Sequence, residues 1–118
     1  MRYMLLIHTD ESDVPSVPPE GAARMSADYA AYSEAMNKAG VNLGGERLKP
    51  ATMAARVRVR DGRTDVLDGP CAATQEKFDG YYLIEVQDID QAIAWAARCP
   101  AAARGTVEVR PVWELNRI

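Results

Sequence analysis

Hydrophobic and polar positions follow two different periods along this chain, and the changes of period mark its elements. Residues 2–9 hold a short run that is apolar at both odd and even positions, which is typical of a strand buried on both faces. From residue 19 to 39 the period becomes that of a helix. The apolar side chains of this helix recur at spacings of four and three: Met25, Tyr29, Tyr32, Met36 and Ala39. We interpret both tyrosines as core residues.

A hairpin is predicted in the middle of the chain. Residues 55–60 alternate Ala or Val with Arg, which is the period of a half-exposed strand. Asp61-Gly62 is a strong turn signal, and residues 64–67 return as the partner strand. We interpret the arginines as the solvated face of the hairpin, with an anion site as the alternative. This row consists of Arg56, Arg58 and Arg60.

The remaining pattern completes an α+β arrangement. Its elements are a strand over 41–48 with an irregularity at Gly44-Gly45, a helical turn over 72–78, a strand over 81–86, a helix from Asp88 to Pro100 and a strand over 106–112. The helix has a capping-box pattern at its start and a predicted apolar face of Ile89, Ala92, Ile93 and Ala96. The order predicts a βαββαβ core with an inserted β-hairpin, and residues 1–118 are enough for one domain but not for two cores.

The two strands expected at the centre of the sheet are apolar on both faces. Tyr3, Leu5 and Ile7 alternate with Met4 and Leu6, and residues 81–86 show the same behaviour. Because both helices of such a fold pack on one side, the other side should be polar. A second copy related by two-fold symmetry is the simplest cover, so we expect a homodimer. The alternative is that the hairpin folds over this face in a monomer.

Composition and charge argue against several classes of partner. The net charge of −3 provides no basic excess for phosphates, so we expect no nucleic-acid partner. No stretch approaches the ~20 apolar residues that span a bilayer, so we expect no membrane partner. The apolar start turns polar at His8 and lacks a small-residue cleavage site, which favours a strand and a cytoplasmic protein. The two separated cysteines argue against a zinc site, and we expect no cofactor.

His8 is the only histidine and therefore the natural general acid or base. An ordinary hydrogen bond at the strand end is the alternative. A ferredoxin-like sheet order would bring His8 close to residues 79–81 (Asp79, Gly80 and Tyr81), to the Asp68-Gly69-Pro70 segment and to Glu46. We predict a pocket there, at the dimer cleft, with His8 and Asp68 as catalytic residues and Glu46, Gly69, Pro70 and Tyr81 as ligand-binding residues. A purely structural turn is an equal alternative for Asp68-Gly69-Pro70.

The segment Asp68-Gly69-Pro70-Cys71, with the residues that follow it up to Val86, resembles the DGPF branch of the YCII-related proteins. Residues 2–7, 40–48, 57–62 and 105–112 look like the same family, so the resemblance covers nearly the whole chain. It implies a ferredoxin-like fold of the dimeric α+β barrel superfamily. Cys71 stands where the family usually has Phe. The histidine of the family's proposed His–Asp pair has no counterpart here, so that pair is not carried over.

Three functions are compatible with these features. The first is a cofactor-free enzyme or binder of a small molecule, for which His8, carboxylates and tyrosines would provide the chemistry. The second is a non-catalytic accessory or ligand-sensing module linked to extracytoplasmic-function sigma factors, which some relatives neighbour or are fused to. The third is a stable dimer without a pocket.

Overall fold

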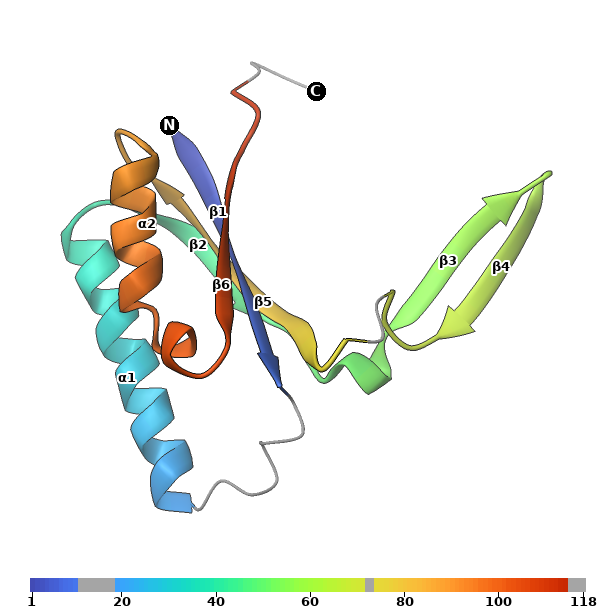
Figure 1. Ribbon diagram of the computed structural model, residues 1–118, viewed down its shortest axis with the longest axis horizontal. Helices are drawn as coiled ribbons and strands as arrows, with labels where there is room; N and C mark the ends of the chain where they lie inside the picture. The colour runs from blue at the N-terminus through green and yellow to red at the C-terminus, as the bar shows by residue number, and fades with distance from the viewer. Residues whose placement is uncertain (11–18, 72–73, 115–118) are drawn as a thin grey trace.

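The computed structural model of this protein describes residues 1–10, 19–71 and 74–114. Its strands and helices are β1 (Arg2–Asp10), α1 (Pro19–Lys38), β2 (Asn42–Arg47), β3 (Ala55–Arg60), β4 (Arg63–Asp68), β5 (Glu76–Glu85), α2 (Ile89–Arg98) and β6 (Thr106–Pro111). This order confirms the predicted α+β arrangement with an inserted hairpin (Figure 1). Among the described helices, none combines the length and apolarity that a bilayer span needs.

Four strands form one antiparallel sheet in the order β2-β5-β1-β6. This is a ferredoxin-like order, and it confirms β1 and β5 as the central pair. Both helices lie on the same side of the sheet (Figure 1). The register places Leu5 opposite Tyr82 on one side and Val109 on the other. Side chains at these positions therefore point towards the helices, and those at neighbouring positions point to the helix-free face.

The core lies between the helices and the sheet. Burial alternates along β1, with Tyr3, Leu5 and Ile7 buried and their neighbours only half-buried. From α1, Met36 and Tyr32 complete the core, and the Tyr32 hydroxyl donates a 2.7 Å hydrogen bond to the carbonyl of Trp95. A buried tyrosine hydroxyl needs such a partner, because an unpaired one would cost free energy. The prediction of Tyr32 as a core residue is confirmed.

The start of α2 matches the sequence, but its buried face differs. Asp88 caps the helix by accepting a 3.0 Å bond from the backbone N–H of Gln91. Ile89 and Ile93, predicted on the apolar face, are 40% and 51% exposed, so this part of the prediction is wrong. The helix packs instead through small residues that allow a close approach to the sheet, and the isoleucines lie on its flank. The residues of this face buried in the core are Ala92, Ala96 and the following Cys99.

The prediction of a helical turn over 72–78 is also wrong for residues 76–78, because β5 already begins at Glu76. Residues 72 and 73 lie outside the described residues. β1 continues to Asp10, and its backbone pairs with residues 76–78 of β5. This tertiary pairing overrides the local pattern that favoured a turn.

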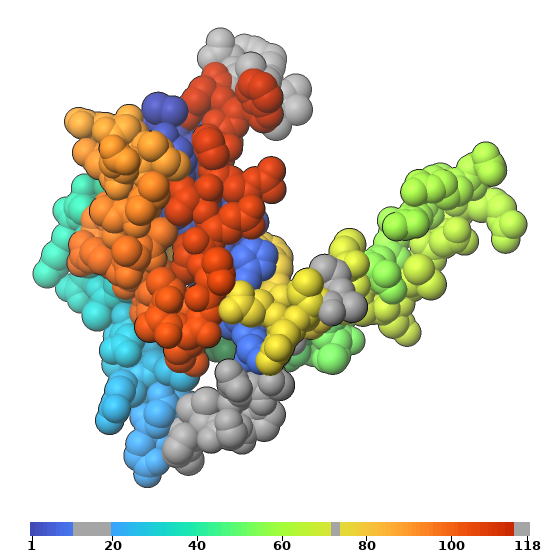
Figure 2. Space-filling view, viewed as in Figure 1, coloured from blue at the N-terminus to red at the C-terminus, as the bar shows by residue number. Residues whose placement is uncertain are grey.

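The hairpin of β3 and β4, which we call the arm (residues 55–68), forms a separate two-stranded sheet. It turns at Asp61 and Gly62, both with positive φ, as a tight hairpin turn requires. The arm stands away from the body on the helix-free side of the sheet (Figures 1 and 2). The radius of gyration is 16.4 Å, compared with about 13 to 14 Å for a compact chain of this length. The arm therefore does not cover the helix-free face of its own chain.

Candidate functional site

A pocket of about 550 Å³ lies between the first half of α1 and the neighbouring end of the sheet. Its volume is within the usual range for small-molecule sites, about 300 to 1,000 Å³. The second half of α1 is anchored in the core by Tyr32 and Met36, whereas residues of the first half line the pocket. The residues that line the pocket include Ile7, Met25, Ser26, Tyr29, Ser33, Glu46, Arg47, Asp79, Tyr82 and Arg104.

Two glycines form part of the sheet side of this pocket. Gly45 pairs with Tyr82, and Gly80 pairs with Arg47 and Ile7, so both occupy helix-facing positions. A Cβ atom on Gly45 would collide with the carbonyl oxygen of Tyr81, and one on Gly80 would lie 2.7 Å from that of Glu46. These approaches are too close for any side chain. The space under α1 stays open because no side chain from these two positions can fill it.

A β-bulge brings an acidic side chain to the same side of the sheet. Ile7 pairs with Gly80 and His8 with Phe78, so Asp79 is an extra residue in β5. Such bulges redirect a side chain. The Asp79 carboxylate accepts a 3.2 Å hydrogen bond from the Thr9 hydroxyl, which orients it. The pocket thus contains a positioned carboxylate that simple strand alternation does not predict.

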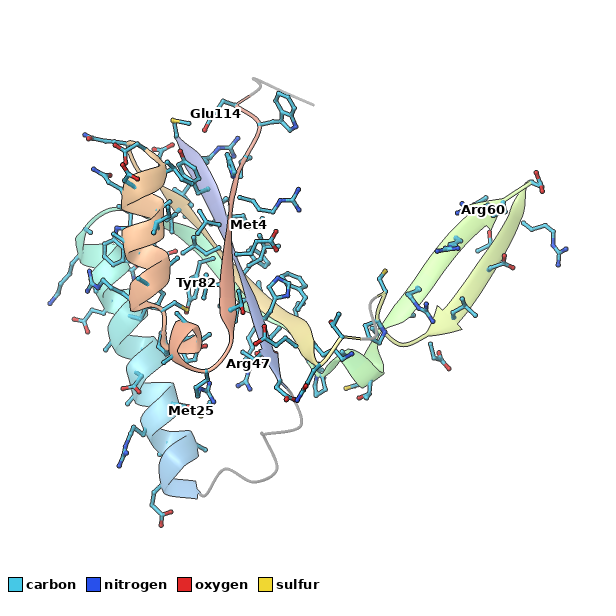
Figure 3. All side chains as sticks on the ribbon, viewed as in Figure 1. Met4, Met25, Arg47, Arg60, Tyr82 and Glu114 are labelled. Atoms are coloured by element: carbon cyan, nitrogen blue, oxygen red, sulfur yellow. The ribbon has the colours of Figure 1, made fainter. Side chains whose placement is uncertain are left out.

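Positive charge and hydroxyl groups complete the lining. Among the described residues, neither Arg47 nor Arg104 has a carboxylate within ion-pair distance. Arg104 Nη1 instead lies 3.4 Å from Met25 Sδ. Ser33 Oγ lies 3.3 Å from the Tyr82 hydroxyl. Figure 3 labels Met25, Arg47 and Tyr82, which come from α1, β2 and β5 respectively.

Tyr29 projects from α1 into this pocket, although its position in the helical stripe suggested a core residue. Burial, with a smaller contribution from Cys99, raises the pKa of Tyr29 to about 12, while Arg104 acts in the opposite sense. The hydroxyl is therefore neutral at physiological pH and can donate a hydrogen bond. It is not suited to act as a base under these conditions.

The predicted site residues separate into two groups. Glu46 and Tyr81 border the pocket, but they occupy strand positions whose side chains point to the helix-free face. His8 and the Asp68-Gly69-Pro70 segment are not among the lining residues. His8 lies on the helix-free face, with Nε2 3.2 Å from Glu108 Oε1. At the base of the arm, the N–H of Gly69 donates a 2.8 Å bond to the carbonyl of Ala54, which extends the pairing of β3 and β4. The catalytic roles of His8 and Asp68 and the ligand-binding roles of Glu46, Gly69, Pro70 and Tyr81 stay predictions.

The sequence analysis did not single out several lining residues. Arg47 and Arg104 were missed, Tyr29 was assigned to the core, and Asp79 was expected beside His8 and not under α1. The periodicity of α1 gives core and pocket positions the same pattern, and a bulge such as that at Asp79 leaves no signal in one sequence. Gly80 beside Asp79 was the available hint, because glycine inside a strand often marks a bulge or a close approach.

The sequence profile of the YCII-related domain matches residues 1–116 of this chain. The chain belongs to the YCII-related family. An uncharacterized protein of Rhizobium meliloti (strain 1021) is 36% identical over 114 residues, which cover 95% of this chain and 92% of that protein. Assignment of this YCII-related protein to the DGPF branch rests on the Asp68-Gly69-Pro70 motif and stays a prediction.

Proposed function

We propose that this YCII-related protein binds a small organic anion, such as a carboxylic acid, in the pocket under α1. The observation that carries the proposal is a 550 Å³ pocket lined by two guanidinium groups, those of Arg47 and Arg104. Neither group has a carboxylate partner among the described residues. Guanidinium groups bind carboxylates through paired, charge-assisted hydrogen bonds.

The remaining lining residues support a ligand with both apolar and oxygen-containing parts. Ile7 and Met25 provide apolar contacts. Ser26 and Tyr29 provide hydroxyl groups, and Tyr29 stays neutral because its pKa is raised to about 12. These groups suit a small keto acid or aromatic acid more than a large or fully apolar molecule.

Proton transfer without a cofactor is the chemistry that this lining favours. The Asp79 carboxylate is oriented by Thr9 and would accept a proton from a carbon next to the ligand's carbonyl group. The electron pair of the broken C–H bond would move to the carbonyl oxygen. The Tyr29 hydroxyl would donate a hydrogen bond to the resulting enolate, and return of the proton at the same or another carbon would complete an isomerase-type reaction.

A homodimer through the helix-free face is the assembly that we propose for this protein. Met4, Leu6, Tyr81 and Leu83 point to this face and are half-buried, while the helices lie on the other side. The arm of the same chain stands away from them (Figure 1). Such a dimer would also enclose the His8–Glu108 pair, which is 3.2 Å long. The predicted dimer cleft around His8 would then form a region distinct from the pocket under α1.

Thermal-shift screening tests the binding proposal directly. Carboxylic acids are compared with their neutral amides, for example benzoate with benzamide and keto acids with keto amides. We expect acids to stabilise the protein and amides to have little effect. Arg47→Gln and Arg104→Gln should each weaken the stabilisation, whereas His8→Ala, outside the pocket lining, should retain it. Equal stabilisation by acid and amide, or retention of binding by both arginine variants, would refute the proposal.

Proton transfer is tested separately, with a stabilising keto acid in D₂O. Exchange of its acidic C–H protons is followed by NMR, and Asp79→Asn should abolish the catalysed exchange while leaving binding within a few-fold. Binding without any catalysed exchange would instead favour the ligand-sensing alternative, including the proposed link to sigma factors.

A further inference from the structure

The two faces of the arm differ sharply in character. Val57 lies directly opposite Val66, and Val59 follows two positions later on the same face. Ala55, Thr64 and Asp68 complete this face, with the two polar residues at its ends. The other face has four arginines and Asp65, and Leu67 is its only apolar residue. Alternation of this kind is typical of a strand pair with one face covered by protein. In the isolated chain, however, no protein covers the apolar face, and its three valines are between 60% and 62% exposed.

An isolated two-stranded hairpin is at best marginally stable in water, since it has no third layer on which to bury apolar surface. The arm nevertheless has a well-formed turn at Asp61-Gly62 and six paired residues in each strand. The valines repeat on one face of the hairpin, which is not expected of a hairpin with both faces in water. The arm is therefore built to pack against something outside the described body of its own chain.

The position of the arm indicates what it packs against. It projects from the helix-free side of the sheet, the side on which the half-buried Met4 lies, and Figure 3 labels Met4 on the body and Arg60 near the tip of the arm. The space-filling view shows an open notch between body and arm (Figure 2). A second copy placed on the helix-free face would enter this notch. In a two-fold dimer each arm then meets the partner in the same way.

We propose that the arm packs its apolar face, Ala55, Val57, Val59 and Val66, against a second copy of this chain, so that two subunits hold each other by reciprocal arms. The arginines of the arm lie on its other face and stay exposed to solvent in this arrangement. This proposal rests on the homodimer proposed above and adds the arm as part of its interface.

The test compares two double variants at matched positions of the hairpin. Val57→Thr with Val66→Thr changes a directly opposed pair on the apolar face and keeps β-branched side chains, which favour strands. Arg58→Gln with Asp65→Asn changes the next opposed pair, on the charged face. Sedimentation equilibrium of each purified protein gives the dimer dissociation constant. We expect the valine variant to raise it about tenfold or more, and the control to leave it within about twofold.

Hydrogen exchange of the unmodified protein provides a second readout that needs no variant. Amide hydrogens of residues 55–68 should be protected well above the dimer dissociation constant and exchange rapidly well below it. A dimer that the valine variant leaves equally tight, or whose arm stays unprotected at high concentration, overturns the arm proposal alone. A monomer at all concentrations overturns both this proposal and the homodimer.

Discussion

Replacement by Phe should have different effects at two tyrosines on the same face of α1. At Tyr32 it should lower stability, and at Tyr29 it should weaken ligand binding. Tyr32 donates its hydroxyl to the Trp95 carbonyl at 2.7 Å and is only 5% exposed. Tyr29, one turn earlier, lines the pocket, and among the described residues its hydroxyl has no hydrogen-bond partner. Replacement of each by Phe removes one oxygen atom and nothing else, so the pair isolates the energetic role of that hydroxyl.

The expected magnitudes follow from the environment of each hydroxyl. Tyr32→Phe loses a hydrogen bond in the core and leaves the Trp95 carbonyl short of one donor, which should cost about 1 to 2 kcal/mol of unfolding free energy. Tyr29→Phe breaks no internal bond and should change stability by less than about 0.5 kcal/mol. The same change should weaken binding of an organic anion, because the pocket loses a neutral donor.

Urea unfolding followed by circular dichroism measures the stability of each variant, and thermal shift with a stabilising carboxylate measures binding. Equal loss of stability in the two variants would show that Tyr29 is a core residue, as the sequence suggested. An unchanged stability of Tyr32→Phe would contradict the hydrogen bond to Trp95. Either result would refute the division of α1 into an anchored half and a pocket half.

Three further predictions concern stability. Burial raises the pKa of Tyr32 far above its ordinary value near 10, so the folded state retains a proton that the unfolded chain loses. The contribution of Tyr32 to the unfolding free energy should therefore be constant below about pH 10 and fall above it, and Tyr32→Phe should reduce this fall in urea titrations. Asp88→Ala should cost about 1 kcal/mol through the lost cap, whereas Asp90→Ala, in the first turn of α2, should cost less because Asp90 does not cap the helix. Gly45→Ala should cost about 2 kcal/mol or more by calorimetry, because its Cβ would collide with the Tyr81 carbonyl. An unchanged melting temperature would contradict this close approach.

Much of the fold follows from local patterns in the sequence. The period of α1, the Asp61-Gly62 turn and the Asp88 cap are each encoded within a few residues, and all three are present in the structure. The pattern of β1 also predicted that Tyr3, Leu5 and Ile7 lie on one face, and these residues are buried. Local rules were sufficient wherever the partner of a segment was its own neighbourhood in sequence.

The errors occur where distant segments decide the outcome. Residues 76–78 became strand because the end of β1 pairs with them. Ile93 is exposed because the close packing of Ala92 and Ala96 orients α2. The pocket depends on the bulge at Asp79 and on the space above Gly80, and both arise from pairing across strands. A single sequence contains no direct record of such pairings.

The place where a carboxylate binds decides whether the pocket under α1 is the functional site. A titration of ¹⁵N-labelled protein with a stabilising carboxylate, followed by backbone amide chemical shifts, would show where the anion binds. We predict that the largest shifts occur at Tyr29, Arg47 and Gly80, which surround the pocket under α1. Shifts concentrated around His8 and Glu108 on the helix-free face would contradict the account and return the site to the dimer cleft.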